Sequence, residues 1–285
     1  MKLQTLTDFA AQVQTQVIGV ASGKGGVGKT TLTVNLAVAL QAMGAKVMFF
    51  DADLGLANAQ LLFGCACPFN LGHVLRGEKT LEEIVVTTRS GVRLIPGASG
   101  VAGMASLSAV DCARVVQGFS TLTEDIDYFL VDLAAGISPM VMTFLAATHR
   151  RLVVVKNEPA SIADAYATVK LLMNDHGVTQ NIHLITNGVD SEMEGLQLFE
   201  RMNKVVLRFL NHPVKYLGSV VQDPHIKEAA VTHQSVLEYA PHSVGARHIR
   251  QLALTLKSLP PVTQLQAGVQ FFFERMIQQG DASHA

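Results

Sequence analysis

The stretch Gly23-Lys24-Gly25-Gly26-Val27-Gly28-Lys29-Thr30 follows an apolar run at 17–20 and precedes a segment with helical periodicity. It fits the pattern G-x-x-x-x-G-K-[ST], which is informative only in such a strand–loop–helix setting. Glycines let the backbone wrap closely around phosphate oxygens, and the loop amides and the helix N-terminus supply positive potential. The stretch therefore predicts a phosphate-binding loop; a glycine-rich turn without a ligand is the alternative.

The end of this loop predicts how a nucleotide is held. Lys29 is expected to reach the β- and γ-phosphates, and the Thr30 hydroxyl is expected to complete the shell of a Mg²⁺ ion. We place Thr31, the next residue, in the same nucleotide site. The predicted ligand is thus a nucleoside triphosphate with Mg²⁺.

The composition of the chain narrows the classes of protein to consider. It has 285 residues, of which 49% are hydrophobic and 16% charged, and its formal net charge is −1. A chain of this length can bury about three quarters of its unfolded surface, so one large domain is expected. The near-zero charge disfavours a broad electrostatic surface for nucleic acid.

Nothing in the sequence predicts export or a membrane span. Residues 1–16 are polar and lack a secretory signal. The longest apolar region, 129–147, is interrupted by Asp132, Gly136 and Pro139, and it is interpreted as a strand followed by a helix. Three cysteines without disulfide or zinc spacing indicate free thiols. We therefore expect a cytoplasmic protein.

Short apolar runs alternate with helical segments along most of the chain. Continuous apolar runs are typical of strands covered on both faces, and the alternation implies right-handed crossovers. The expected fold is an α/β, doubly wound, mostly parallel sheet with helices on both faces, as in P-loop NTPases. We divide the chain into an N-terminal extension (1–15), an ATPase domain (16–258) and a C-terminal tail (259–285). Strands are expected at 17–21, 46–50, 92–95, 128–131, 152–155, 182–186 and 214–220, and helices at 30–43, 108–122, 162–174 and 194–210.

Carboxylates follow two of the expected strands. Asp51 and Asp53 come directly after the strand at 46–50, and Asp132 ends the strand at 128–131. The carboxyl ends of parallel strands form the crevice where α/β sheets bind ligands. Asp132 fits a Mg²⁺-holding carboxylate of the Walker B type. A carboxylate near a γ-phosphate is repulsive unless a proton or metal intervenes, so a carboxylate at this place suggests water activation rather than phosphate binding.

An extra lysine makes the phosphate-binding loop more specific. Lys24, in Lys-Gly-Gly-Val-Gly-Lys-Thr, resembles the deviant Walker A motif of the MinD/ParA/nitrogenase-iron-protein class. The resemblance implies an ATPase in which this lysine reaches across a homodimer to the nucleotide of the other subunit. A second cation supplied in this way would make ATP hold the subunits together and would stabilise the charge on the transferring phosphoryl group.

The same resemblance assigns further site residues. It implies that Asp53 orients the attacking water and lies near the metal, and that Asp51 supports this switch region and the surroundings of the Mg²⁺ ion in the cofactor site. Gly136 would be a switch glycine whose amide senses the γ-phosphate, and Asn187 would bind the adenine edge through its amide. The implied catalytic residues are Asp53, Lys24 and Lys29, the metal ligands Thr30, Asp132 and Asp53, and the cofactors ATP and Mg²⁺.

Several stretches resemble one branch of this class, the flagellar-number regulators called FlhG or FleN. That branch implies flagellar partners, such as the GTPase FlhF or a flagellar transcription regulator. Relatives commonly begin with an arginine-containing helix that stimulates FlhF, and the corresponding stretch here, 7–14, has no arginine. Activation of FlhF is therefore open. The resembling stretches are 51–58, 95–100, 132–136 and 157–166.

The tail predicts an amphipathic helix. Membrane-binding relatives end in such a helix, and dimerisation would turn two weak anchors into one useful anchor. Only one cation, Arg275, lies in the tail, so packing on protein is the alternative. The resemblance favours ATP-dependent peripheral association with the inner membrane. The apolar face consists of Leu265, Val269, Phe272, Phe273 and Met276.

Three other functions compete with a flagellar switch. One is a MinD-like regulator of the cell-division site, and another is a ParA-like segregation ATPase that binds DNA. DNA binding is not expected, because Arg247, His248, Arg250 and Lys257 are the only candidate basic cluster. A scaffold that binds ATP without turnover would have no need for Asp53. We expect slow ATP hydrolysis, as in a switch whose useful state is the ATP-bound dimer.

Overall fold

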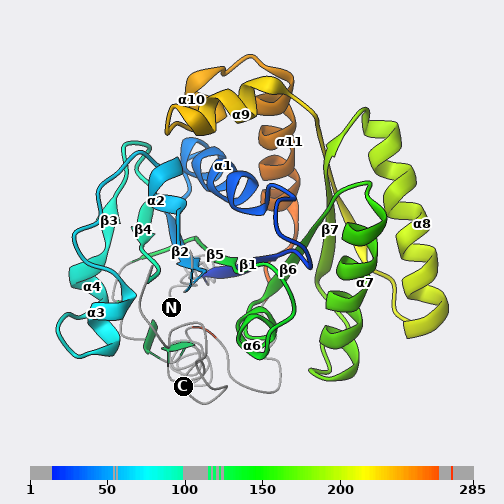
Figure 1. Ribbon diagram of the computed structural model, residues 1–285, viewed down its shortest axis with the longest axis horizontal. Coiled ribbons are helices and arrows are strands. Elements are labelled where there is room, and N and C mark those ends of the chain that lie inside the picture. Colours follow the sequence, from blue (N-terminus) through cyan, green and yellow to red (C-terminus); the bar gives the residue numbers. More distant parts are fainter. Residues whose placement is uncertain are drawn as a thin grey trace, which may run out of the picture.

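The computed structural model describes residues 15–53, 55, 57–98, 115–116, 118–119, 122, 125–262 and 271. Its centre is an eight-stranded sheet with the order β3-β4-β2-β5-β1-β6-β7-β8 (Figure 1). Neighbouring strands are parallel except β3, which pairs antiparallel with β4. The strands are β1 (Gln16–Ala21), β2 (Val47–Ala52), β3 (Val86–Thr87), β4 (Arg93–Ile95), β5 (Tyr128–Leu133), β6 (Arg150–Val155), β7 (Ile182–Val189) and β8 (Lys215–Val221).

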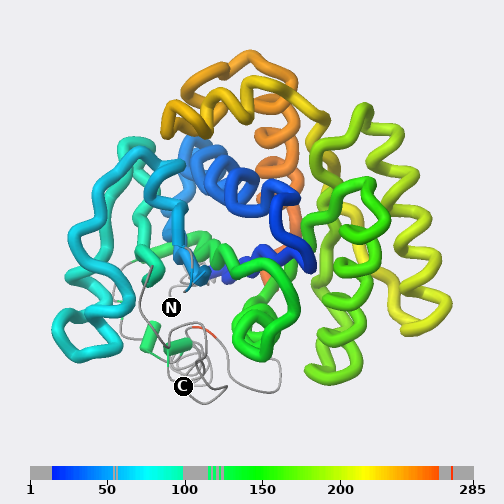
Figure 2. The backbone as a smooth tube through the Cα atoms, in the orientation of Figure 1, coloured from blue at the N-terminus to red at the C-terminus, as the bar shows by residue number. Residues whose placement is uncertain are grey.

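Helices cover both faces of this sheet (Figure 1). The longer ones are α1 (Lys29–Ala42), α6 (Pro139–Ala146), α7 (Pro159–Asn174), α8 (Glu192–Leu210), α9 (Pro224–Val231) and α11 (Val244–Ser258). The helix α11 lies against α1 (Figure 2). The shorter helices are α2 (Ala59–Leu62), α3 (Leu71–Leu75), α4 (Leu81–Ile84) and α10 (Val236–Tyr239).

Alternate strand residues point into two separate hydrophobic cores. In β1, Val17 belongs to the core shared with α6, α7 and α8, and Ile18 belongs to the core shared with α1 and α11. Every residue of β1, β2 and β6 is buried, which explains why their apolar runs are continuous rather than alternating. The doubly wound, mostly parallel fold expected from the sequence is confirmed.

The expected strands are all present, with boundaries that differ by up to three residues. The sequence did not predict β3, because a two-residue strand shows no periodicity. Of the helix expected at 108–122, most lies outside the described residues. The described sheet and its covering helices extend from Gln16 to Ser258, and the division into extension, domain and tail stays a prediction.

Residues 259–262 and Phe271 of the tail are described, and Phe271 is buried in the chain's own core. The ring centroid of Phe271 lies 5.4 Å from that of Phe119 and 5.5 Å from that of Phe129. Phe271 is not part of the predicted apolar face, whose residues all lie outside the described part of the chain, as do residues 7–14. Among the helices that are described, none is long and apolar enough to cross a membrane.

Candidate nucleotide-binding site

The phosphate-binding loop joins β1 to α1, as the sequence predicts, and β1 lies in the middle of the sheet. Gly26 and Gly28 have positive φ angles of 79° and 85°, which favour glycine. Gly23 is required for a different reason: a Cβ there would lie 2.4 Å from the backbone carbonyl of Asp164 in α7. The loop is therefore fixed both by its own backbone conformation and by contact with α7.

A buried ion pair lies beneath this loop. Lys29 Nζ is 2.7 Å from Asp132 Oδ1 and 3.2 Å from Thr30 Oγ1. The Thr33 hydroxyl also donates to Asp132 Oδ1, at 3.0 Å. The structure thus brings together three residues that the sequence assigned to phosphate and metal binding, and it adds Thr33, which lies one helical turn after Lys29 and was not predicted.

The oxygen atoms at this position fit a magnesium ion. Asp132 Oδ2 is buried and has no hydrogen-bond partner among the described residues. An unpartnered, buried carboxylate oxygen is costly unless a cation or a donor satisfies it. With the neighbouring Thr30 hydroxyl, it forms a set of hard oxygen ligands of the kind that Mg²⁺ prefers.

Asp51 lies opposite Asp132 on the neighbouring strand β2. Its carboxylate accepts hydrogen bonds from the amides of Asn58 (3.0 Å), Ala59 (2.9 Å) and Asp53 (3.2 Å). Burial, together with the charge of Asp132, raises the pKa of Asp51 to about 7. Asp51 therefore holds both ends of the segment 53–59, on which Asp53 lies, and Asp53 Oδ1 in turn accepts from Gly55 N at 3.3 Å.

Two of the predicted site groups contact other residues of their own chain. Lys24 Nζ lies 3.0 Å from Glu158 Oε2, and both side chains are about half exposed. The hydrogen bond with Lys24 and its positive charge lower the pKa of Glu158. The Gly136 amide donates to the Ser22 carbonyl at 2.9 Å.

A pocket of about 340 Å³ continues from the loop toward the ends of β7 and β8. Asn187 lines it and donates from Nδ2 to the Val27 carbonyl at 2.7 Å, so the predicted base-binding residue lies next to the loop. The sequence did not predict that Lys156 and Gly188 line this pocket. Their positions could have indicated it, because each directly follows a residue at or near the end of an apolar strand. The other lining residues include Gly26, Gly28, Thr31, Val221, Gln222, Asp223, Ile226 and Lys227.

Comparison with known proteins identifies the family. The model of the CobQ/CobB/MinD/ParA nucleotide binding domain matches residues 18–236. The chain belongs to the MinD/ParA family. It is 40% identical over 263 residues to the antiactivator FleN of Pseudomonas aeruginosa, which covers 92% of this chain and 94% of FleN.

Two further relatives support this assignment to the MinD/ParA family. The flagellum site-determining protein YlxH of Helicobacter pylori is 32% identical over 274 residues, covering 95% of this chain and 92% of YlxH. The structure of the septum site-determining protein MinD of Pyrococcus horikoshii, complexed with Mg-ADP, has a TM-score of 0.70 and 28% identity. It covers 86% of this chain and 96% of that one. The chain is a MinD/ParA-type ATPase.

Proposed function

We propose that this ATPase is an ATP-dependent dimerising switch that regulates the placement or number of flagella. The observation that carries the proposal is the similarity to FleN, which extends over 92% of the chain. YlxH, a protein named for determining the flagellar site, is similar over a comparable length. The MinD of Thermotoga maritima is 35% identical over only 60% of the chain, so a flagellar function is favoured over a role at the division site.

The site residues are proposed to divide the work of hydrolysis. Lys29 binds the β- and γ-phosphates, and Thr30 and Asp132 hold Mg²⁺. The bound metal supplies positive charge that neutralises the transferring phosphoryl group. Asp53 positions the attacking water, and Asp51 fixes the segment that carries Asp53. Asn187 and the pocket between the ends of β7 and β8 bind the base.

Lys24 is proposed to couple ATP binding to dimerisation. Its half-exposed ammonium lies beside the loop and is paired only with the half-exposed Glu158 among the described residues. Such an exposed ion pair is weak, so Lys24 can leave Glu158 and bind a phosphate of the nucleotide in a second subunit. ATP would then bridge two copies, and slow hydrolysis would separate them.

Partners and the membrane would act on the ATP-bound dimer. We propose that the C-terminal tail associates with the inner membrane once two copies are joined, because two weak anchors then act together. Flagellar proteins, such as FlhF or a transcription regulator, are the proposed partners of the dimer.

The dimer is tested with Asp53→Ala, which should bind ATP without turning it over. Light scattering after size exclusion is expected to find a dimer in Mg-ATP and a monomer in Mg-ADP. Lys24→Ala and Lys29→Ala should stay monomeric in both nucleotides. A monomeric Asp53→Ala protein in saturating Mg-ATP would exclude the dimer mechanism.

The output is tested by two further measurements. Asp53→Ala should pellet with anionic liposomes in ATP, and a chain ending at Leu259 should not. In cells, loss of the gene should change the number or position of flagella without producing minicells. Minicells with normal flagella would instead assign the chain to division-site control, and ATP-dependent pelleting with DNA would favour a segregation ATPase.

A further inference from the structure

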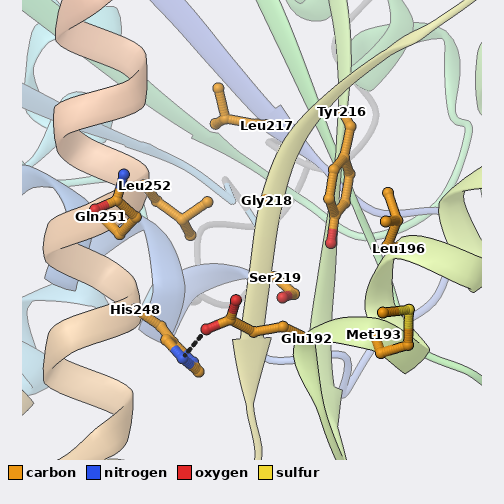
Figure 3. A pocket seen from close by; sticks show the side chains of 10 residues that line it. All are labelled: Glu192, Met193, Leu196, Tyr216, Leu217, Gly218, Ser219, His248, Gln251 and Leu252. Atoms are coloured by element: carbon orange, nitrogen blue, oxygen red, sulfur yellow. Dashed lines mark ion pairs between the residues drawn. The ribbon is translucent and has the colours of Figure 1, made fainter.

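A second groove, of about 290 Å³, runs along the open edge of the sheet at β8 (Figure 3). Four consecutive residues of β8, from Tyr216 to Ser219, line it together with residues of α8 and α11. Successive side chains of a strand point to opposite faces of the sheet, and α8 and α11 cover these two opposite faces. The groove is lined by consecutive residues of β8 and by helices from both faces, so it lies at the edge of the strand. We call it the β8 edge groove.

The backbone of β8 points hydrogen-bonding groups into the β8 edge groove. The Gln222 amide donates to Val189 of β7 at 2.8 Å, whereas the Val221 amide donates outward to His248 Nδ1 of α11 at 3.1 Å. Successive amides of a strand point to opposite sides, so the Ser219 amide also points away from β7. Among the described strands β8 pairs only with β7, which leaves this edge able to accept another strand.

A hydrogen bond between Glu192 and His248 closes the groove at the end of β8. Because His248 Nδ1 accepts from Val221, its Nε2 carries the proton and donates to Glu192 Oε1 at 2.9 Å. The bridge crosses the strand from α8 to α11 (Figure 3). In this arrangement His248 is uncharged and its N–H binds the Glu192 carboxylate, and the other residues that line the groove carry no charge, so the groove suits an uncharged occupant.

The two walls of the groove are largely apolar. Met193 and Leu196 come from α8, and Leu252 comes from α11. Met193 is 62% exposed. Gly195 lets the first turn of α8 approach the sheet, since a Cβ there would lie 2.7 Å from Ser219 Cβ. An extended chain paired with β8 would turn its side chains alternately toward these two walls.

We propose that the β8 edge groove binds a short extended segment of a partner protein, which adds a strand to β8 through backbone hydrogen bonds and places apolar side chains against Met193, Leu196 and Leu252. The segment is short because Gly218, with φ of 148°, lies at a register irregularity opposite Leu184 and Ile185 that interrupts the regular edge.

A second copy of this chain would have to approach the same groove with its own helices. The edge of β8 lies between the side chains of α8 and α11, which both line the groove. Pairing two β8 strands would require the backbones to approach to about 4.8 Å. The helices α8 and α11 of the second copy would then have to come alongside those of the first, whereas an extended segment carries no helices.

The proposal is tested with a yeast-displayed library of random decapeptides, selected on the full chain in Mg-ATP. Enriched peptides are expected to alternate apolar residues and to lack charge at those positions. The best synthetic peptide should bind Met193→Asp at least tenfold more weakly by fluorescence anisotropy. The control Leu254→Asp, on an exposed position of α11 outside the groove, should bind normally. Both variants should keep wild-type ATPase activity, and the bound peptide should protect the Ser219 amide from hydrogen exchange.

Several results would overturn the proposal. One is a library without enrichment, and another is a selected peptide whose binding survives Met193→Asp or leaves the Ser219 amide unprotected. If a chain ending at Val262 bound the peptide more tightly than the full chain, the tail of the same chain would be the occupant. Self-association that Met193→Asp abolished would instead assign the groove to a second copy.

Discussion

Lys29 Nζ lies 2.7 Å from Asp132 Oδ1, with both side chains buried beneath the phosphate-binding loop. The pair joins the start of α1 to the end of β5, across two strands that are neighbours only in the folded sheet. It therefore links the proposed phosphate-binding cation to the proposed metal ligand. A buried charge that loses its partner is strongly destabilising, so the pair is sensitive to substitution of either residue.

Replacing the carboxylate of this pair should destabilise the fold. Asp132→Ala leaves the Lys29 ammonium buried without its main partner, and the expected loss is on the order of 3 kcal/mol. Urea unfolding in the absence of nucleotide measures it. Asp175→Ala, at an exposed position after α7, is the control and should change stability by less than about 0.5 kcal/mol. Equal losses in the two variants would contradict this role of the pair.

The pKa of Asp51 predicts a pH-dependent stability. Burial and the Asp132 charge raise this pKa to about 7, well above the value near 4 in an unfolded chain. The unfolded state loses its proton first, so the stability contributed by protonated Asp51 declines as the pH rises from about 4 to about 7. Asp51→Asn should remove this decline, although its amide nitrogen cannot accept one of the backbone hydrogen bonds that the carboxylate accepts. Relative to wild type, the variant should therefore gain stability between pH 4.5 and pH 8, on the order of 3 kcal/mol.

Urea unfolding of wild type and Asp51→Asn at pH 4.5 and pH 8 checks this expectation. The stability of Asp51→Asn relative to wild type should be higher at pH 8 than at pH 4.5. Asp175→Asn, the exposed control, should follow the wild-type profile. A difference that was constant across this range would mean that Asp51 is ionised in the folded protein throughout.

A buried histidine predicts a dependence of the opposite sign. His183 in β7 is 1% exposed, and neither ring nitrogen has a hydrogen-bond partner of ordinary geometry among the described residues. Burial, and then the charge of Arg150, lower its pKa to about 4. The unfolded state takes up its proton near pH 6.5, so stability falls as the pH drops from about 6.5 to about 4.

His183→Leu should therefore stabilise the protein most at acidic pH. The expected gain at pH 5 is on the order of 2 kcal/mol, because the variant removes both the proton uptake and the unsatisfied polar atoms. Chemical unfolding at pH 5 and pH 8 measures it, with His212→Leu as the exposed control. A gain that was no larger at pH 5 than at pH 8 would argue against a neutral, buried imidazole.

Alanine substitutions at three glycines of the phosphate-binding loop distinguish the effect of steric contact from that of backbone strain. Gly23→Ala would place a Cβ 2.4 Å from the Asp164 backbone, so the loop or α7 must shift and nucleotide binding should be lost. Gly26→Ala meets no atom within 4 Å but has a φ of 79°, which costs about 1–2 kcal/mol. Gly25→Ala has neither problem, since its nearest atom is Ala135 Cβ at 4.0 Å.

Without nucleotide, the unfolding free energy should be lowest for Gly23→Ala, higher for Gly26→Ala, and close to the wild-type value for Gly25→Ala. Binding of a fluorescent ATP analogue then reports how far the loop still accepts phosphate. Equal stability of Gly23→Ala and Gly25→Ala would show that α7 can move away from the loop without a loss of unfolding free energy.

Local signals were sufficient for much of the fold. The strand–loop–helix around Gly23 to Thr30 is determined by glycines and apolar residues that are adjacent in the chain. The strands could be predicted because both of their faces are buried, which makes their apolar runs continuous. The two-residue strand β3 gave no such signal, and it forms because β4 offers it an antiparallel neighbour.

The sequence by itself determined the phosphate-binding loop, the carboxylates at strand ends and the parallel sheet, because each depends on residue type and short-range periodicity. The tertiary structure alone decided that Lys29 meets Asp132, that Lys156 and Gly188 line the pocket beside Asn187, and that Phe271 enters the aromatic core. It also created the groove beside β8 between α8 and α11. These contacts join residues far apart in the chain, and the order of strands in the sheet, which no local pattern encodes, brings them together.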